Sequence, residues 1–294
     1  MIPLPKSVEL EELLNMIREI SWNVSDIFTS YDPIRVNKKE LVKRLNIQNL
    51  DKGPVTDADI EVSELIKRSI KQRYPLAEWD FLSEEDKISH YEKISDKKWV
   101  WIIDPLDGTK DFINKTGEYA MHLALTFEKR VILGIVLIST KNQLWFSIAG
   151  EKTWYENKNL VKTICVKESI KNINQISILT SKSHMHESFQ FLLNDLKPNR
   201  VIGMGSIGYK ITSILRGEGD VYISYSLPSG TCPRDWDIAA PASLIKGAGG
   251  FFTDINGKEL EFLNEGFNQR GILIASLNKN HFEICRTISN IVNT

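Results

Sequence analysis

The chain opens with apolar residues at helical spacing. They recur every three or four positions and are Leu10, Leu13, Leu14, Ile17 and Ile20. This spacing places side chains on one face of an α-helix, so we predict an amphipathic helix that reaches Ser30. Ser7 precedes the run and is a residue type that caps helix N-termini, which makes it the predicted N-cap.

A second helix is predicted beyond a polar connector. Residues 38–49 are charged, which is typical of a short helix or a mobile loop, and Gly53–Pro54 then signals a turn. The helix after this turn has an apolar face formed by Val62, Leu65, Ile66 and Ile70.

Strand patterns follow in the middle of the chain. The run Trp99–Ile103 is apolar and rich in β-branched residues, which predicts a buried strand that leads directly into Asp104. Three further strand-like segments lie between Met121 and Ala149, with a turn at residues 128–130. They predict an antiparallel meander.

From Ile176 onward, strands and helices alternate, which indicates an α/β arrangement. The predicted strands are Ile176–Leu179, Arg200–Gly203, Asp220–Ser224 and Phe251–Asp254, and the predicted helices are Glu187–Leu196, Tyr209–Arg216 and Trp236–Gly247. We therefore expect an α+β lobe over residues 1–165 and an α/β lobe over 166–294. No repeat or low-complexity linker separates them, so they are expected to form one continuous unit, joined near residues 150–175.

Composition narrows the class of protein. The 294 residues are 42% hydrophobic and 26% charged, as in an ordinary globular protein, which excludes disordered, collagen-like and coiled-coil chains. Lys and Arg number 37 against 38 Asp and Glu, a net charge of -1. Because no overall field attracts polyanions, binding to a nucleic acid polymer or an anionic membrane is not expected, and an anionic ligand needs a local site.

Cysteines and hydropathy indicate the compartment. Cys165, Cys232 and Cys285 lie far apart and form neither a disulfide framework nor a C-x-x-C pair, so we expect thiols in a reducing cytosol. The N-terminal residues lack the pattern of a signal peptide. The apolar run Val131–Ile138 is too short to span a bilayer. We expect a soluble, cytoplasmic protein without a membrane span.

The most informative motif is Asp104-Pro-Leu-Asp107-Gly108-Thr109. Pro105 and Gly108 favour a sharp turn at the end of the strand, which can turn both carboxylates to the same side. Two like charges at short range repel unless a cation lies between them. The structural alternative is a solvent-exposed turn with two hydrated aspartates.

Other acids lie near predicted element ends, and each has its own structural alternative. Asp57 and Asp59 suit the N-cap of a helix, Glu84 and Glu85 suit a solvated pair, and Asp237 suits the first turn of a helix, where it offsets the dipole. Taken as metal ligands, they form a set of oxygen donors. Such a set favours Mg²⁺, with Mn²⁺ as the alternative, over zinc.

The substrate follows from the metal. Because Mg²⁺ shares its coordination positions with water and substrate phosphate, the predicted substrate is a phosphate ester. Two ions about 3.5–4 Å apart can hold the attacking and leaving oxygens of an in-line displacement.

Two motifs of other enzyme classes resemble parts of this sequence, but the sequence departs from both. Phosphatases with an aspartate nucleophile use D-x-D-G-T, whereas Pro105 stands two positions before Asp107, which removes that nucleophile. Residues 203–208 match G-x-G-x-x-G between a strand and a helix, but Asp220 comes too early for the ribose contact of a dinucleotide site. Backbone N–H groups at that helix start can instead hold a substrate oxygen or phosphate.

Taken together, five motifs resemble the inositol monophosphatase superfamily in order and spacing, over roughly residues 8–275. They are Val55–Asp59, Leu82–Glu85, Trp101–Thr109, Trp236–Ala240 and Ala248–Gly250. Within that superfamily, residues 51–56 and 107–112 are most similar to the 3'(2'),5'-bisphosphate nucleotidases of the CysQ type. The resemblance implies a layered α/β/α/β/α sandwich, as in the inositol monophosphatase and fructose-1,6-bisphosphatase folds.

The resemblance also implies roles for individual residues. Metal ligands are Glu84, Asp104, Asp107, Asp237 and the Leu106 carbonyl; Asp59 and Thr109 orient and deprotonate the attacking water; Glu85 is a supporting acid. Substrate contacts are assigned to Glu84, Leu106, Asp107, Gly108, Thr109, Ser206, Lys210, Arg234 and Asp237. Of these, the Gly108 and Thr109 amides hold phosphate.

Departures from the nucleotidase pattern concern substrate choice. Lys210 matches a lysine directed at the second phosphate of the nucleotide, but Ile207–Gly208 replaces a serine pair. Ser224 stands where nucleotidases carry Arg and inositol phosphatases carry Glu. Arg234 can supply the missing charge or be a solvated loop residue. His184 lies in a segment that resembles one near the adenosine, and a surface histidine is the alternative.

The resemblance implies hydrolysis of the 3'-phosphate of 3'-phosphoadenosine 5'-phosphate, or of its phosphosulfate relative, with two or three Mg²⁺ ions. It further implies inhibition by Li⁺ and a place in sulfur metabolism, and homodimers are common among similar proteins. The alternatives are an inositol or sugar phosphate phosphatase and, from another class, a non-catalytic phosphonucleotide binder.

Overall fold

The computed structural model describes residues 2–31, 46–50, 53–86, 93–148, 150–157, 160–164, 172–182 and 185–293. Its α-helices are α1 (Leu10–Ser30), α3 (Asp57–Arg73), α4 (Thr109–Asn114), α5 (Glu187–Leu196), α6 (Ile207–Arg216), α7 (Asp235–Gly247) and α8 (His281–Val292). Its strands are β1 (Gln48–Leu50), β2 (Gly53–Val55), β3 (Trp79–Ser83), β4 (Trp99–Asp107), β5 (Ala120–Phe127), β6 (Arg130–Ile138), β7 (Gln143–Ile148), β8 (Lys152–Asn157), β9 (Leu160–Ile164), β10 (Ser177–Ser181), β11 (Arg200–Met204), β12 (Val221–Tyr225), β13 (Phe251–Asp254) and β14 (Ile272–Ser276).

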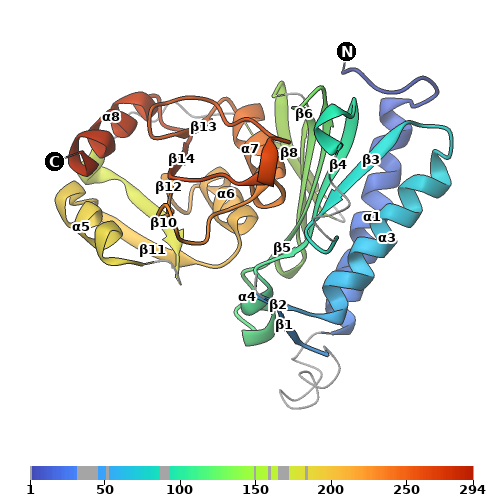
Figure 1. Cartoon of the computed structure of the whole chain (residues 1–294), viewed down its shortest axis with the longest axis horizontal. Coiled ribbons are helices and arrows are strands. Elements are labelled where there is room, and N and C mark those ends of the chain that lie inside the picture. Colours follow the sequence, from blue (N-terminus) through green and yellow to red (C-terminus); the bar gives the residue numbers. More distant parts are fainter. Residues whose placement is uncertain are drawn as a thin grey trace.

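These elements form five layers that alternate between helix and sheet (Figure 1). Helices α1 and α3 cover the outer face of a large sheet, α6 and α7 lie between this sheet and a smaller one, and α5 and α8 cover the far face of the smaller sheet. The predicted α/β/α/β/α sandwich is confirmed.

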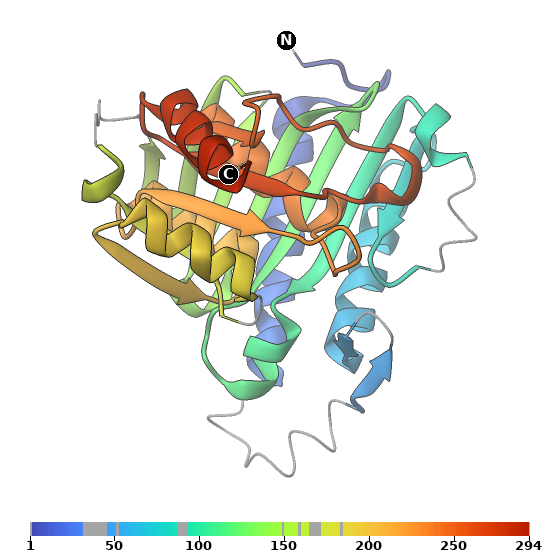
Figure 2. The same ribbon diagram turned by 60° about the vertical axis from the view of Figure 1, so that its left-hand side comes forward.

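The large sheet has the strand order β3-β4-β5-β6-β7-β8-β9, in which only β3 and β4 pair in parallel. The predicted meander is therefore confirmed, and its first turn places Glu128 and Lys129 at positive φ, as tight hairpin turns require. The sheet continues through β8 and β9, beyond the predicted end at Ala149 (Figure 2).

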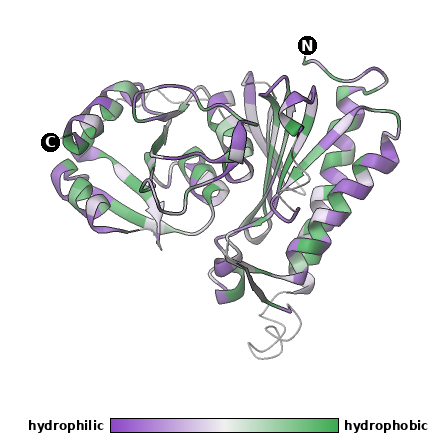
Figure 3. Ribbon diagram, in the orientation of Figure 1, coloured by the Kyte–Doolittle hydropathy of each residue, from purple (hydrophilic) through white to green (hydrophobic). Residues whose placement is uncertain are grey.

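Both faces of the large sheet are buried because its strands carry apolar residues at successive positions. In β4, Trp101 and Ile103 pack with α1 and α3, while Val100 and Ile102 pack with α6 and α7. A strand that is covered on both sides needs such a continuous apolar run. Figure 3 shows the helices α1 and α3 with hydrophobic and hydrophilic stretches along their surfaces, as expected for an outer layer.

The smaller sheet has the order β11-β10-β12-β14-β13, with β10 parallel to both β11 and β12 and with β14 antiparallel to its two neighbours. The predicted alternation of strands and helices is confirmed, although β14 and α8 were not expected. Because β10, β11 and β12 are parallel, their C-terminal ends meet at one edge. Ligands of open α/β sheets bind at such edges.

Some local predictions are wrong. Ser7 does not cap α1, because it lies in a turn at φ 75° and Glu9 occupies the N-cap position without a side-chain hydrogen bond. Gly53–Pro54 is not a turn, since both residues belong to β2, which pairs with β1. A two-stranded ribbon tolerates proline because both strands are edge strands. Of the connector 38–49, residues 38–45 lie outside the described residues, as does the predicted lobe boundary at 165–166.

Two further observations concern cysteines and membranes. Cys232 and Cys285 are free thiols, and Cys165 lies outside the described residues. Among the helices of the described chain, none has the length and apolar character needed to cross a membrane.

The packing of α7 on the large sheet depends on a glycine in β6. A Cβ atom added to Gly134 would lie 2.6 Å from the Cβ of Ser243 and 3.0 Å from the carbonyl oxygen of Ala240, both in α7. We therefore expect Gly134→Ala to lower the free energy of unfolding by about 1–3 kcal/mol, because the core has no room for the methyl group. Urea unfolding of the purified variant measures this change. The matched control is Gly230→Ala, where the nearest atom is 3.5 Å from the added Cβ, and equal losses in both variants would contradict the packing argument.

Candidate metal centre and active site

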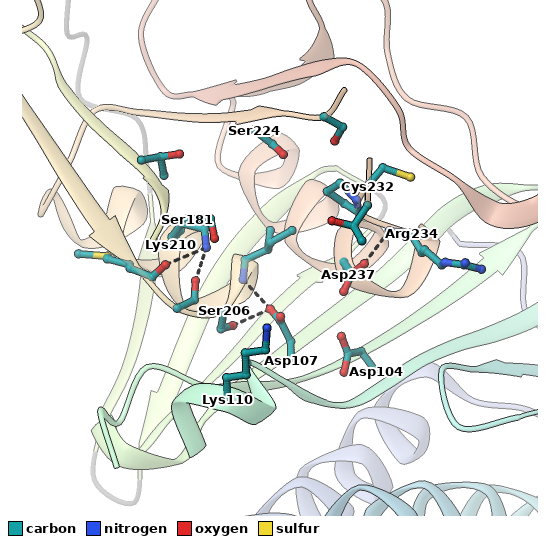
Figure 4. A pocket seen from close by; sticks show the side chains of 18 of the residues that line it. Asp104, Asp107, Lys110, Ser181, Ser206, Lys210, Ser224, Cys232, Arg234 and Asp237 are labelled. Carbon is teal, nitrogen blue, oxygen red and sulfur yellow. Dashed lines mark hydrogen bonds between the residues drawn. The ribbon is translucent and has the colours of Figure 1, made fainter. Parts of the chain in front are cut away.

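A cavity of about 460 Å³ lies where the end of β4 faces the C-terminal edge of the smaller sheet. Its walls come from both sheets and from the starts of α4, α6 and α7 (Figure 4). All residues that the sequence assigned to substrate contacts line it, and they are Glu84, Leu106, Asp107, Gly108, Thr109, Ser206, Lys210, Arg234 and Asp237. Asp104 lines it as well.

Strand β4 presents two aspartates through a β-bulge. Residues three apart in a regular strand face opposite sides, because side chains alternate. The register with β5 shifts between Asp104, which pairs with His122, and Asp107, which pairs with Ala120, so β4 contains one extra residue. The bulge returns both carboxylates to one side. The strand thus passes through Pro105, and the sharp turn comes only at Gly108, whose φ is 91°.

Asp107 is held by the start of α6, which belongs to the other half of the chain. Its Oδ2 atom accepts hydrogen bonds from the Ser206 hydroxyl (2.6 Å), the Ile207 amide (2.5 Å) and the Gly208 amide (3.2 Å). The backbone N–H groups that the sequence suggested for a substrate therefore stabilise a carboxylate of the protein here.

Two glycines of the 203–208 motif, Gly205 and Gly208, permit close packing between the two halves. A Cβ atom on Gly205 would lie 2.4 Å from the Glu118 carbonyl oxygen, and one on Gly208 would lie 2.2 Å from Nε2 of His122. The Gly205 amide also donates to the Glu118 carboxylate at 2.8 Å. This packing accounts for the glycine spacing without a dinucleotide.

Asp59 and Thr109 form a hydrogen-bonded pair behind the cavity wall. Asp59 is the third residue of α3, where its Oδ2 accepts from the amide (2.8 Å) and the hydroxyl (2.5 Å) of Thr56, the N-cap. Its Oδ1 accepts from the Thr109 hydroxyl at 3.3 Å, and this hydroxyl also lies 3.1 Å from the Leu106 carbonyl oxygen. Asp59 is 2% exposed and reaches the cavity only through Thr109.

Asp237 and Glu84 complete the acidic cluster. Asp237 is the third residue of α7, and its Oδ2 accepts from the Arg234 amide at 2.6 Å. Glu84 directly follows β3, and its amide donates to the Ile103 carbonyl oxygen at 3.1 Å, which ties it to β4 beside Asp104. Glu85 is partly buried next to it.

The acids in this cluster are poorly solvated and repel one another. Burial raises the pKa of Asp59 to about 6, and burial together with the charge of Asp107 raises the pKa of Asp237 to about 7. The pKa values of Glu84 and Asp104 are raised well above their ordinary range, chiefly by burial and then by the charges of Asp237 and Glu84, respectively. The Oδ2 atom of Asp104 is buried without a hydrogen-bond partner. A cation would satisfy that oxygen and offset the repulsion, so the residues fit a divalent metal.

His122 is the site residue that the sequence did not reveal. It lies on β5, is 1% exposed, and contacts Asp107 Oδ2 through Nε2 (3.2 Å) and the Trp236 carbonyl oxygen through Nδ1 (3.3 Å). One ligand atom from each of Asp104, Asp107 and His122 lies within 4.8 Å of the others. Burial lowers the pKa of His122, which favours the neutral ring. The only signal in the sequence is a histidine inside an otherwise apolar strand.

Two cations line the cavity in different ways. Lys210 is 3% exposed, and its Nζ donates to the carbonyl oxygens of Met204 (3.3 Å) and Gly205. Burial lowers its pKa to about 8. The guanidinium of Arg234 lies over the Trp236 ring, 5.4 Å from its centroid, and Figure 4 shows it on the opposite side of Asp237 from Lys210.

Of the remaining specificity candidates, Ser224 lines the cavity and adds no charge to it. His184 lies outside the described residues.

Comparisons with known proteins agree with this geometry. The model of the Inositol monophosphatase family matches residues 9–293. The 3'(2'),5'-bisphosphate nucleotidases CysQ of Escherichia coli (strain K12) and Salmonella typhimurium are 30% and 26% identical, each over 88% of this chain and 98% of the relative. Among solved structures, an IMPase from Thermotoga maritima has a TM-score of 0.73 and 22% sequence identity, over 96% of this chain and 98% of that chain. Staphylococcal IMPase-I has a TM-score of 0.74 and 18% sequence identity, over 96% of both chains.

The raised pKa values predict how the metal-free protein responds to pH. A carboxyl whose pKa is higher in the folded than in the unfolded chain favours folding below its unfolded value, near 4, and this stability is lost as pH rises through its folded value. With Asp59 at about 6 and Asp237 at about 7, we expect the free energy of unfolding to fall by about 2 kcal/mol or more between pH 5 and pH 8 in the presence of EDTA. Saturating Mg²⁺ should reduce the loss.

Urea unfolding at both pH values, with EDTA and with Mg²⁺, measures this effect. Asp104→Asn should show a smaller loss, because it removes a carboxyl whose own pKa is raised by burial and by the neighbouring charges. Asp26→Asn on the exposed face of α1 removes the same charge elsewhere and should behave as the unaltered chain does. A pH dependence that Asp104→Asn leaves unchanged would contradict the repulsion argument.

Proposed function

The chain belongs to the inositol monophosphatase family of metal-dependent phosphatases, and we propose that it removes the 3'-phosphate from 3'-phosphoadenosine 5'-phosphate or its phosphosulfate relative. The products are AMP, or adenosine 5'-phosphosulfate, and phosphate. The observation that carries the proposal is the buried acidic cluster facing a cavity that also contains Lys210, a cation without a carboxylate partner among the described residues. The choice of a nucleotide as the substrate rests on the similarity to the CysQ relatives.

Metal binding is assigned to the acids at the floor of the cavity. The proposed ligands are Glu84, Asp104, Asp107, Asp237 and the Leu106 carbonyl oxygen. Two or three Mg²⁺ ions are proposed, with Mn²⁺ as the alternative, and bound ions neutralise phosphoryl oxygens and lower the pKa of water. Inhibition by Li⁺ stays a prediction from the resemblance.

Thr109 and Asp59 are assigned the role of accepting the proton that the attacking water loses. The Thr109 hydroxyl donates to Asp59 Oδ1, so its lone pairs are free to accept from a water molecule in the cavity. As the water loses its proton to Thr109 Oγ1, the hydroxyl proton moves to Asp59 Oδ1. A pKa of about 6 suits Asp59 as the final acceptor near neutral pH.

The proposed contacts with the phosphates of the nucleotide come from residues that line the cavity. The amides of Gly108 and Thr109, beside Asp107, are proposed to hold the transferred phosphate, and Lys210 to bind the second phosphate of the nucleotide. A buried lysine that donates only to backbone carbonyls has charge left over for an anion. A volume of about 460 Å³ lies within the usual range for small-molecule sites of about 300–1,000 Å³.

The second candidate is an inositol or sugar phosphate phosphatase. Ser224 is compatible with it, because this position in the cavity wall carries neither the Arg of the nucleotidases nor the Glu of the inositol phosphatases. A non-catalytic binder is disfavoured by the Asp59–Thr109 hydrogen bond, since binding a phosphonucleotide does not require a pair that accepts a proton.

The first prediction for this function concerns substrate choice. We expect 3'-phosphoadenosine 5'-phosphate to be hydrolysed with a lower KM than adenosine 3'-monophosphate, which lacks only the second phosphate. Lys210→Met should raise the KM for the bisphosphate by about ten- to a hundredfold and leave the monophosphate nearly unchanged, because a charge-assisted contact is lost. Arg234→Met is the control cation and should have a smaller effect. Steady-state phosphate release from both substrates by the unaltered protein and the two variants measures these effects, and a preference for inositol 1-phosphate would reject the nucleotidase assignment.

The second prediction concerns the proton acceptor. We expect Asp59→Asn and Thr109→Val each to lower kcat by about 10²- to 10⁴-fold, because the water loses its base. Binding of Mg²⁺ should persist in both variants when followed by calorimetry. Asp57→Asn, two positions earlier on α3, removes the same charge without touching the pair and should retain activity. A fully active Asp59→Asn enzyme would overturn the assigned role.

A further inference from the structure

His122 occupies a position between the acids of β4 and the start of α7. It pairs across the sheet with Asp104, and its ring lies between the carboxylate of Asp107 and the peptide that joins Trp236 to Asp237. The side chain is 1% exposed, so no solvent reaches its nitrogens. Every polar contact of the ring is therefore with the protein or with a bound ligand.

The two ring nitrogens of His122 have different neighbours. Nδ1 lies 3.3 Å from the Trp236 carbonyl oxygen and 3.9 Å from Asp104 Oδ2, and the tautomer with its hydrogen on Nδ1 satisfies the Trp236 carbonyl. In that tautomer Nε2 has a free lone pair. This atom has no hydrogen-bond partner in the described chain, and its nearest polar neighbour is another acceptor, Asp107 Oδ2, at 3.2 Å.

Two buried atoms with free lone pairs thus face the same cluster. Besides Nε2 of His122, the Oδ2 atom of Asp104 lacks a partner. Leaving buried acceptors without a partner is unfavourable. Together with Asp107, these residues bring ligand atoms within 4.8 Å of one another, which is close enough to share one cation.

The fold makes room for this ring. Nε2 lies so close to Gly208 that an added Cβ atom would be 2.2 Å away, although Gly208 lies in the first turn of α6, where alanine would favour the helix. A glycine at this position gains nothing for the helix itself. The glycine permits the imidazole to occupy this position, because a side chain here would collide with it.

We propose that His122 Nε2 is a ligand of the metal ion held by Asp104 and Asp107, so that one ion of the centre has a mixed nitrogen and oxygen ligand set. This inference rests on the metal centre of the proposed function and refines its metal. Imidazole binds first-row transition ions better than it binds Mg²⁺, so this position favours Mn²⁺ over Mg²⁺. The Nδ1–H bond to the Trp236 carbonyl is the outer contact that orients a ligating histidine.

Pulsed electron paramagnetic resonance on the Mn²⁺-loaded full chain tests the ligand directly. We expect a coupling from a directly bound nitrogen in the unaltered protein. It should change to the ¹⁵N pattern when only the histidines carry ¹⁵N, an experiment that needs no variant and no assay of activity. His122→Gln should abolish the coupling. His186→Gln is the matched control, because His186 caps α5 and contacts the Tyr225 carbonyl oxygen instead of the acids, and it should leave the coupling intact.

Calorimetric titration of the metal-free protein provides the second measurement. His122→Gln should weaken Mn²⁺ binding by about 10- to 100-fold and Mg²⁺ binding by much less, so that the preference for Mn²⁺ disappears. Thermal unfolding without metal confirms that the variant folds, and the isotope experiment decides the question if it does not.

The failures of the two proposals differ. Bound Mn²⁺ without any histidine nitrogen coupling overturns the role of His122 and leaves a phosphatase with oxygen ligands intact. A clear coupling in a protein that hydrolyses no phosphomonoester supports the ligand and overturns the proposed function instead.

Discussion

Repulsion among buried carboxylates is the constraint on which the arrangement of this molecule depends. Several acids sit in one solvent-poor cavity, and the backbone stabilises most of them with hydrogen-bond donors at helix starts. Asp107 accepts from the first amides of α6, Asp237 from the N-cap amide of α7, and Asp59 from the N-cap residue of α3. Positive helix ends favour such negative charges. Asp104 lies in a strand and has one oxygen without a partner, so it depends most on a cation.

The same contacts join the two halves of the chain into one site. The start of α6 follows a strand of the smaller sheet, yet it holds a carboxylate of the larger one. Gly205 and Gly208 permit this approach, because a side chain on either would collide with Glu118 or His122. The proposed metal centre therefore forms only when both sheets are in place, and changes in their packing will alter the positions of the proposed ligands.

Sequence patterns predicted the parts of this design that depend on neighbouring residues in the chain. Apolar periodicity identified α1 and the central strands, and acids at element ends identified Asp104, Asp107 and Asp237. The bulge in β4 escaped prediction because it is defined by the register with β5. His122 escaped because strand patterns favour apolar positions and its polar partners, Asp107 and Trp236, come from other elements. Strands β8 and β9 were missed, and β9 has exposed side chains, so its pairing with β8 defines it and not an apolar buried face.

The charges around the cavity also imply an order of binding. Without metal, a phosphate ester entering the cavity approaches Glu84, Asp104, Asp107 and Asp237, and like charges in a poorly solvated space repel strongly. Lys210 offsets only part of this repulsion, because it supplies a single positive charge against these acids. In the proposed function, bound metal ions would convert the same acids into a site that attracts anions, so metal binding would precede productive binding of the substrate. Lys210 would then select for the second phosphate of the proposed nucleotide, so that the metal supplies attraction and the protein supplies selection.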